Sequence, residues 1–365
     1  MLKNMDKKKL FIIAGAIVGA IVLIIIILLI FHAMHPTKKS YAAIENDLLK
    51  AAQKYYGDNE NLLPQNANEQ ITIDDATLTS LDYLDNLNDM AEEGVTCSGK
   101  VVVSYVNGKY RYTPILDCGE VYKTETLYSH IENNVTRVFN ESGLYDLNGE
   151  YVYRGEKPNN YLEFSGKMYR IVKLTNGKVV IIYDEKLDSY PWDDRFNDVR
   201  NGTDGYNEYK ISRIKEVLEE LYNSDEIVSE SDKQLVSNQT VYVGKRSESD
   251  NYNDGSIEKS DYLENQYFGL LPLYDYINAS IDPKCNSVIT DNCVNYNYLN
   301  YYHRSWWTST ADNSNNYKVY RISPSGKIEK STAAIYGNVR PIVYLVSDAI
   351  YVSGDGTYEN PYKIK

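Results

Sequence analysis

Residues 161–185 read YLEFSGKMYRIVKLTNGKVVIIYDE, and this stretch decides the fold expected for the C-terminal part of the chain. Runs rich in Val, Ile and Tyr alternate with turn residues, a pattern that is typical of antiparallel strands. Asn176-Gly177 favours a two-residue hairpin turn, because such a turn needs positive φ at both central residues. The stretch therefore predicts a β-meander, in which consecutive strands lie side by side.

The sequence that follows the meander predicts one helix and further strands. Residues 212–223 place apolar side chains at i, i+3, i+4, i+7 and i+8, which is the spacing of one helix face. Strands are expected at 317–322 and 339–346, and residues 350–364 favour a closing hairpin. We therefore expect residues 145–365 to form one α+β domain with a twisted antiparallel sheet.

A series of short motifs runs through residues 145–350. The motifs are NYLEFSGKMYRIV at 160–172, WDD at 192–194, SRIKEVLEELYN at 212–223, FGLL at 268–271, WW at 306–307 and GNVRPIVYL at 337–345. In this order they resemble a family of uncharacterised bacterial surface domains with the C-type lectin-like fold, which is related to formylglycine-generating enzymes. The resemblance implies a rigid scaffold that displays a ligand-binding surface, and it is an analogy of fold.

Two chemistries associated with that fold need residues that this chain lacks. Formylglycine-generating chemistry needs a reactive cysteine pair in a catalytic cleft, whereas Cys285 and Cys293 lie in one short loop. Calcium-dependent sugar binding needs a Glu-Pro-Asn or Gln-Pro-Asp loop with a downstream Trp-Asn-Asp, and neither sequence occurs. The resemblance therefore implies binding without either chemistry.

A second Asn-Gly hairpin lies in the N-terminal half of the chain. The segments VVVSYV and KYRYTPIL flank Asn107-Gly108, which favours the same two-residue turn. Cys97 and Cys118 are equally distant from this turn along the chain. The hairpin therefore places them opposite each other, at a separation that a disulfide can bridge.

The remaining cysteines, Cys285 and Cys293, close a short loop and are expected to pair by default. An even number of cysteines is typical of proteins from oxidising compartments, and four free thiols are the alternative. The cysteine pattern therefore favours two disulfides and a location outside the cytoplasm.

Residues 10–32 form an apolar stretch without charged residues or proline. About 20 apolar residues suffice to cross a bilayer as a helix, and the stretch is longer than the apolar part of a cleaved signal peptide. The leader at 1–9 carries four lysines, which by the positive-inside rule places the N-terminus in the cytoplasm. The sequence predicts a single-pass protein of the cell membrane, with the lipid bilayer as a partner of residues 10–32 and the bulk of the chain outside.

Residues 37–122 are expected to form a small α+β unit. Residues 40–57 carry apolar side chains on one helix face, with Ser40 as N-cap and Gly57 at the C-terminal end. A membrane helix, a second helix and a disulfide-closed hairpin, in that order, resemble type IV pilin-like proteins. The Gly-Phe cleavage junction and the glutamate used in pilin assembly are absent from the apolar stretch, so pilin function is not implied. A polar linker is expected at 123–144.

The charge balance limits the partners. The chain of 365 residues has 38 Lys and Arg against 51 Asp and Glu, which gives a formal net charge of -13. This charge repels phosphate backbones, so we expect no nucleic-acid partner. Only four histidines occur, and no nucleophile, metal-binding or phosphate-binding motif is found. We therefore expect no enzyme activity, no metal and no cofactor.

Residues 250–261 match part of the EF-hand pattern for a calcium-binding loop, which is the one alternative to the absence of a metal. The acidic residues at EF-hand positions in this segment are Asp250, Asp254, Glu258 and Asp261. A tyrosine stands at the third position, an aspartate replaces the bidentate glutamate at the last, and no helix pattern leads into the loop. A solvated acidic loop is therefore favoured over a calcium site.

The strongest candidate for a binding surface is NYNYLNYYHRSWW at 295–307. Tyr and Trp beside Asn and Ser give rigid amphipathic contacts, which are typical of paratopes and sugar-stacking surfaces. The alternative is that Trp306 and Trp307 begin a buried core strand. The candidate ligand-binding residues are Tyr296, Tyr298, Tyr301, Tyr302, His303 and Trp306.

These patterns together predict a membrane-anchored bacterial surface protein whose distal domain binds an extracellular glycan or protein. The alternative is a structural subunit of a pilin-like surface assembly. Such a subunit would self-associate through the helix at 40–57.

Overall fold

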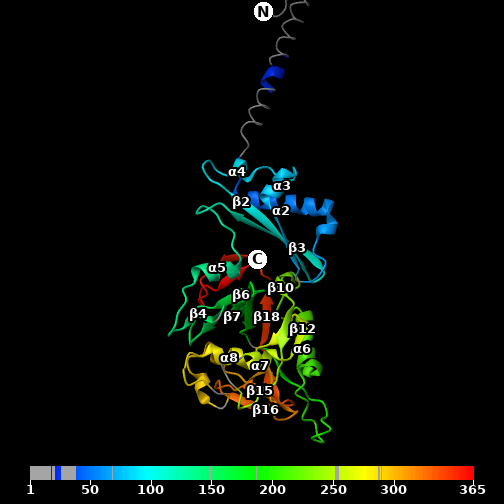
Figure 1. Cartoon of the computed structure of the whole chain (residues 1–365), viewed down its shortest axis with the longest axis vertical. Helices are drawn as coiled ribbons and strands as arrows, with labels where there is room; N and C mark the ends of the chain where they lie inside the picture. The colour runs from blue at the N-terminus through cyan, green and yellow to red at the C-terminus, as the bar shows by residue number, and fades with distance from the viewer. Residues whose placement is uncertain are drawn as a thin grey trace, which may run out of the picture. The chain divides into compact units, whose positions relative to one another are not determined.

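The computed structural model in Figure 1 describes residues 18, 21–25, 38–67, 69–147, 149–185, 187–250, 255–286, 288 and 290–365. The chain divides into two compact units. Unit 1 comprises Met1–Leu63, Ile71–Val103 and Tyr112–Lys123. Unit 2 comprises Pro64–Gln70, Ser104–Arg111 and Thr124–Lys365.

The structure does not bear out the first element of the predicted fold class, the transmembrane helix. Within the part of the chain that the structure describes, no helix is long and apolar enough to cross a membrane. Of residues 10–32, only Val18 and residues 21–25 are described, and a span needs about 20 residues. The rest of the expected anchor and the leader at 1–9 lie outside the described residues. The observed fold is a mixed α/β arrangement with two disulfides.

Unit 1 packs a long helix on a three-stranded sheet of order β1-β2-β3. The helix α2 begins after Ser40, whose side chain accepts a hydrogen bond from the backbone N–H of Ala43, as predicted. Its apolar face is buried, and Leu48 lies so close to the sheet that only the missing side chain of Gly99 leaves room for it. The elements are α2 (Tyr41–Asp58), η1 (Glu60–Leu62), β1 (Gln70–Asp74), α3 (Asp75–Ser80), α4 (Leu87–Met90), β2 (Ser98–Val106) and β3 (Lys109–Asp117).

Both predicted disulfides are present. Cys97 and Cys118 are joined with their Cα atoms 4.1 Å apart, and Cys285 and Cys293 with theirs 4.5 Å apart. Asn107 and Gly108 both have positive φ, at 52° and 76°, which is the conformation that the two-residue turn requires. The turn and the cysteine positions therefore agree with the hairpin read from the sequence.

The large sheet of unit 2 contains ten described strands. Its main path runs β10-β18-β8-β7-β6-β20-β19, with β13 paired to β18, and β4 and β5 joined to it through β7. The predicted meander forms β6, β7 and β8, which pair antiparallel, and Asn176 and Gly177 both have positive φ. The strands are β4 (Gly143–Leu147), β5 (Glu150–Arg154), β6 (Tyr161–Phe164), β7 (Lys167–Thr175), β8 (Lys178–Tyr183), β10 (Val236–Ser237), β13 (Phe268–Leu270), β18 (Pro341–Leu345), β19 (Tyr351–Ser353) and β20 (Tyr362–Ile364).

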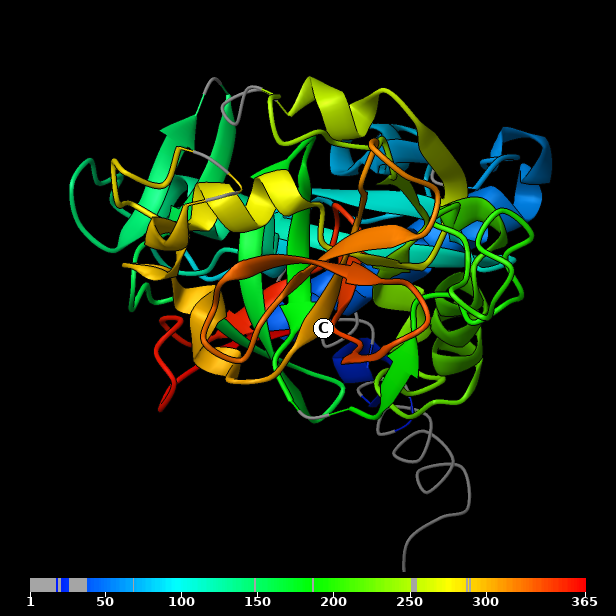
Figure 2. The ribbon, with the colours of Figure 1, turned by 90° about the horizontal axis from the view of Figure 1, so that it is seen from below.

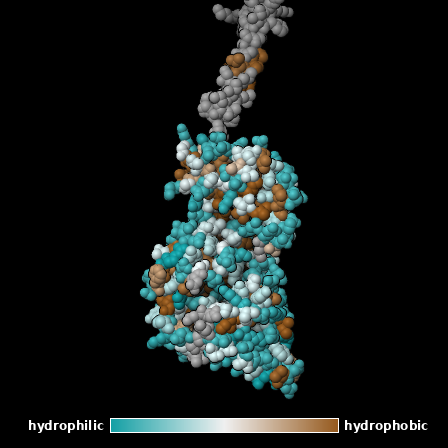
Figure 3. All heavy atoms as spheres, in the orientation of Figure 1, coloured by the Kyte–Doolittle hydropathy of each residue, from teal (hydrophilic) through white to brown (hydrophobic). Residues whose placement is uncertain are grey.

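Two smaller sheets complete the strands of unit 2. A five-stranded sheet of order β16-β15-β14-β17-β9 is drawn in orange and green in Figure 2, in front of the green meander strands, and β11 pairs with β12. The visible face of unit 2 is mostly hydrophilic, with scattered apolar residues (Figure 3). The strands are β9 (Ser189–Pro191), β11 (Gln239–Tyr242), β12 (Tyr262–Gln266), β14 (Trp306–Ala311), β15 (Lys318–Ile322), β16 (Ile328–Thr332) and β17 (Tyr336–Asn338).

The helices of unit 2 are mostly short. The exception is α6, which buries Ile214, Val217, Leu218 and Leu221 and confirms the helix predicted from their spacing. The helices are α5 (Leu127–Asn134), η2 (Tyr209–Ile211), α6 (Arg213–Asn223), η3 (Lys233–Leu235), α7 (Ser256–Lys259), α8 (Leu273–Ala279), η4 (Asp291–Val294) and η5 (Tyr298–Tyr302).

The segment at 123–144, expected as a linker, is folded instead. It contains α5, which begins after the N-cap Thr126, and the side chains of Leu127 and Ile131 are fully buried in the core of unit 2. The backbone N–H of Leu127 donates to the carbonyl of Ala349 at 2.8 Å. Burial of these two apolar side chains attaches the segment to unit 2, so residues 124–144 belong to that unit.

Candidate functional site

The structure separates the residues that the sequence proposed as a binding surface. Tyr298 is 2% exposed and lies beneath the guanidinium of Arg170, and Trp306 is 1% exposed and packs edge-on against Tyr276. These two side chains belong to the core. For Trp306 this agrees with the alternative that Trp306 and Trp307 begin a buried strand. Tyr296 is 56% exposed, and His303 is also exposed. The side chains of Tyr301 and Tyr302 are outside the described part of the structure.

Tyr296 lines a polar cavity of about 480 Å³, which we call the Tyr296 cavity. The side-chain oxygen of Asn300 is buried there and accepts no hydrogen bond from the described residues. Hydrogen bonds from the Asn295 side chain and the Lys284 backbone lower the pKa of Asp282, whose carboxylate is thereby engaged. The lining residues are Glu156, Asp282, Val294, Asn295, Tyr296, Asn297 and Asn300.

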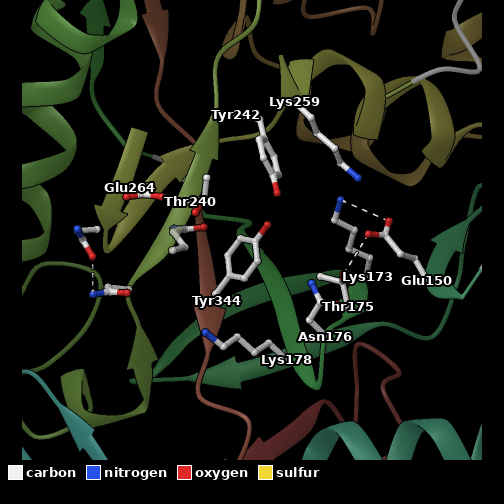
Figure 4. Close-up of a pocket in the computed structure, with 13 residues that line it drawn as sticks. Glu150, Lys173, Thr175, Asn176, Lys178, Thr240, Tyr242, Lys259, Glu264 and Tyr344 are labelled. Carbon is white, nitrogen blue, oxygen red and sulfur yellow. Dashed lines mark hydrogen bonds and ion pairs between the residues drawn. The ribbon is translucent and has the colours of Figure 1, made fainter. Parts of the chain in front are cut away.

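A second polar cavity, of about 460 Å³, is lined by more ionisable side chains than the first. It was not predicted from the sequence. We call it the lysine–tyrosine cavity; Figure 4 shows its lining. Its side chains come from β5, β7, β8, β11, α7, β12 and β18, and from the turns beside them. They are Glu150, Lys173, Thr175, Asn176, Lys178, Asn238, Gln239, Thr240, Tyr242, Lys259, Glu264, Asn265 and Tyr344.

Lys173 is the buried cation of this cavity, and its charge is balanced by the protein. Its Nζ lies 2.9 Å from a carboxylate oxygen of Asp275 and 3.9 Å from one of Glu150. Burial acts to lower the pKa of Lys173, but the attraction of these carboxylates outweighs burial and raises that pKa above its usual value. Glu150 also accepts a hydrogen bond of 3.0 Å from the hydroxyl of Thr175.

Lys178 and Lys259 form no ion pair within the described part of the chain. The Nζ of Lys178 donates to the hydroxyl of Ser237 at 2.7 Å, and burial without a carboxylate partner lowers the pKa of Lys178. The Nζ of Lys259 lies 5.8 Å from the centre of the Tyr242 ring. The cavity is therefore lined by two lysines, the half-buried Lys178 and the exposed Lys259, that form no ion pair among the described residues, and the same holds for the exposed carboxylate of Glu264.

Two tyrosines and one glutamine supply neutral polar groups. The hydroxyls of Tyr242 and Tyr344 point into the same central space as the ammonium groups of Lys173 and Lys259 (Figure 4). Burial raises the pKa of Tyr344 to about 12, against the attraction of Lys173, so its hydroxyl stays protonated and can donate. Gln239 is 5% exposed, and its Oε1 is buried without a hydrogen-bond partner among the described residues, although its Nε2 donates to two carbonyls.

Two irregularities of strand pairing border the cavity. The β7–β8 register shifts between Ile171 and Lys173, and the β11–β12 register shifts between Gln239 and Val241. Such bulges change the direction of neighbouring side chains and are common beside functional sites. Lys173 and Gln239 lie at these two positions and both line the cavity.

The position of Glu258 argues against a calcium-binding loop at 250–261. This residue is 1% exposed, and both of its carboxylate oxygens bond to the guanidinium of Arg246, at 2.9 and 2.6 Å. A carboxylate engaged in this way is not available to a calcium ion, and residues 251–254 lie outside the described part. Across the described residues, no group of three or more His, Cys, Asp or Glu side chains is arranged to hold a metal ion.

The fold and the cavity define this chain as a disulfide-containing, two-unit α/β protein with a polar, lysine-bearing cavity. No family model, no curated protein and no solved structure matches the chain. The resemblances to C-type lectin-like domains and to pilin-like proteins therefore stay predictions.

Proposed function

We propose that unit 2 binds an extracellular saccharide in the lysine–tyrosine cavity. The observation that carries the proposal is the density of hydroxyl, amide, ammonium and carboxylate groups around one concave space. Sites of about 300–1,000 Å³ are typical for small ligands, but most are lined by apolar side chains. A polar lining of this size instead suits a ligand rich in hydroxyl groups.

The lining offers a saccharide both donors and acceptors. Tyr242, Tyr344 and Thr240 can donate through their hydroxyls, and the Glu264 carboxylate can accept. A saccharide hydroxyl does both at once, so it can bridge such groups.

The two disulfides support an extracytoplasmic location for both units, because disulfides persist in oxidising compartments. The alternative of self-association through the helix at 40–57 has less support. The apolar face of α2, which includes Ile44, Leu48 and Ala52, is already buried in the core of unit 1.

Binding of the full chain to a panel of neutral and acidic oligosaccharides, measured by titration calorimetry, tests this proposal. The double variant Tyr242→Phe and Tyr344→Phe keeps both rings and removes two hydroxyls. We expect it to weaken binding roughly 10-fold, since each lost hydrogen bond contributes about 0.5–1.5 kcal/mol. Tyr336→Phe, at an exposed position outside the cavity, is the matched control and should bind as the parent does.

Two outcomes would contradict the proposal. One is the absence of binding to every saccharide of the panel. The other is binding that the double variant leaves unchanged. If Tyr296→Ala abolished binding in that second case, the site would instead be the Tyr296 cavity.

A further inference from the structure

The charges around the lysine–tyrosine cavity are unusual for this chain. The protein carries a net charge of -13, yet three lysines and two glutamates line the cavity. Lys173 is neutralised by Asp275, which is not among the lining residues, and by Glu150. Glu150 also binds Thr175, so its charge is engaged by the protein. This leaves Lys178 and Lys259 as cations, and Glu264 as the one lining anion, without an ion-pair partner among the described residues, so positive charge is in excess.

The positions of these two lysines differ. In Figure 4 Lys259 reaches from α7 toward the central space, where the hydroxyls of Tyr242 and Tyr344 also point, whereas Lys178 lies beyond Tyr344. Glu264 lies on the other side of Thr240 from Lys259 in the same view. The unpaired ammonium of Lys259 therefore shares its space with two neutral hydroxyl donors. Three donors around one space form an arrangement that suits an anionic oxygen group.

We propose that the saccharide bound in this cavity is acidic, with one anionic group held by Lys259 and the hydroxyls of Tyr242 and Tyr344. A second acidic group lies toward Lys178. The inference rests on the proposed saccharide-binding function and adds the chemical class of the ligand. An uncompensated, partly buried ammonium such as that of Lys178 gains a partner when an acidic ligand binds, which a neutral saccharide cannot provide.

The test compares trigalacturonate with its methyl ester, which keeps the hydroxyl groups and removes the negative charges. Calorimetric titrations of the full chain should show the acid binding about 10- to 100-fold more tightly than the ester, as expected for charge-assisted hydrogen bonds. Lys259→Met should remove most of this preference and leave binding of the ester within about 3-fold. Lys178→Met should have a smaller effect in the same direction, and added salt should weaken binding of the acid alone.

Lys327→Met is the matched control, because Lys327 lies outside the cavity and pairs with Asp291 at the surface. An unchanged midpoint of chemical denaturation shows in each variant that the fold is intact. Equal affinities for acid and ester, both reduced by the tyrosine double variant, would overturn the acidic-ligand inference and leave saccharide binding standing. Absence of binding to both, and to every other saccharide of the panel, would overturn both.

Discussion

The Glu258→Gln variant is expected to lose about 3–5 kcal/mol of unfolding free energy, because it removes the negative charge from a buried ion pair. Arg246 is fully buried, and it makes two hydrogen bonds to Glu258. The backbone N–H of Tyr274 also donates to Glu258, at 3.3 Å, so the carboxylate joins α7 to α8. Chemical denaturation of the full chain, monitored by tryptophan fluorescence, measures the loss.

A matched surface pair separates this effect from a general effect of charge removal. Lys215 and Glu219 form an exposed ion pair at i and i+4 of α6, so Glu219→Gln should cost less than about 1 kcal/mol. Replacing both buried partners, with Arg246→Met and Glu258→Leu, should recover much of the stability, since the pair is then lost without leaving a lone charge. A loss below 1 kcal/mol for Glu258→Gln would show that this pair is not buried as described.

The Trp306→Ala variant is expected to lose a similar amount, about 3–5 kcal/mol, because it opens a cavity in the core of unit 2. The indole packs edge-on against Tyr276 with ring centres 5.8 Å apart, and the guanidinium of Arg340 lies 5.1 Å from the ring. The same denaturation measurement applies. A ligand-contacting Trp306 would instead be exposed, and its removal would reduce binding without reducing stability.

Tyr296→Ala provides the contrast within the same segment. Tyr296 is exposed, so its truncation should change the unfolding free energy by no more than about 0.5 kcal/mol. Equal effects of the two substitutions on stability would contradict the positions that the structure gives these side chains.

Local rules predicted the local structure well. The Asn-Gly pairs at 107–108 and 176–177 formed the expected turns, because few other residues take positive φ at two successive positions. The position of Cys97 opposite Cys118 follows from strand pairing alone, and α6 follows from helical spacing. Each of these features depends on fewer than 25 consecutive residues.

The local rules did not predict which aromatic side chains of residues 295–307 are buried. Tyr296 and His303 both have positive φ, at 47° and 54°, and they lie on either side of η5. Positive φ is uncommon for residues other than glycine, although asparagine, aspartate and histidine adopt it more often than most, so the sequence does not locate these changes in chain direction. They help determine which tyrosines face the core and which face solvent. Amino-acid composition does not distinguish these tyrosines from one another.

The lysine–tyrosine cavity could not be predicted for a different reason. Its residues are separated by up to about 190 positions and come from seven elements, so no spacing pattern unites them. Lys173 and Lys178 also look like ordinary strand-end cations in the sequence. Only the pairing of β7, β8 and β18 in one sheet, the position of the separate β11–β12 sheet, and the register shifts beside Lys173 and Gln239 bring these side chains together.

Protection of lysines from acylation tests most directly whether the lysine–tyrosine cavity is the ligand site. The full chain is acetylated briefly with and without saturating acidic saccharide, and the modification of each lysine is measured by mass spectrometry. If the cavity is the ligand site, Lys259 and Lys178 should be acetylated more slowly when ligand is bound. The acetylation of Lys327 should be the same with and without ligand. Equal modification of Lys259 and Lys178 with and without a ligand that demonstrably binds would contradict it.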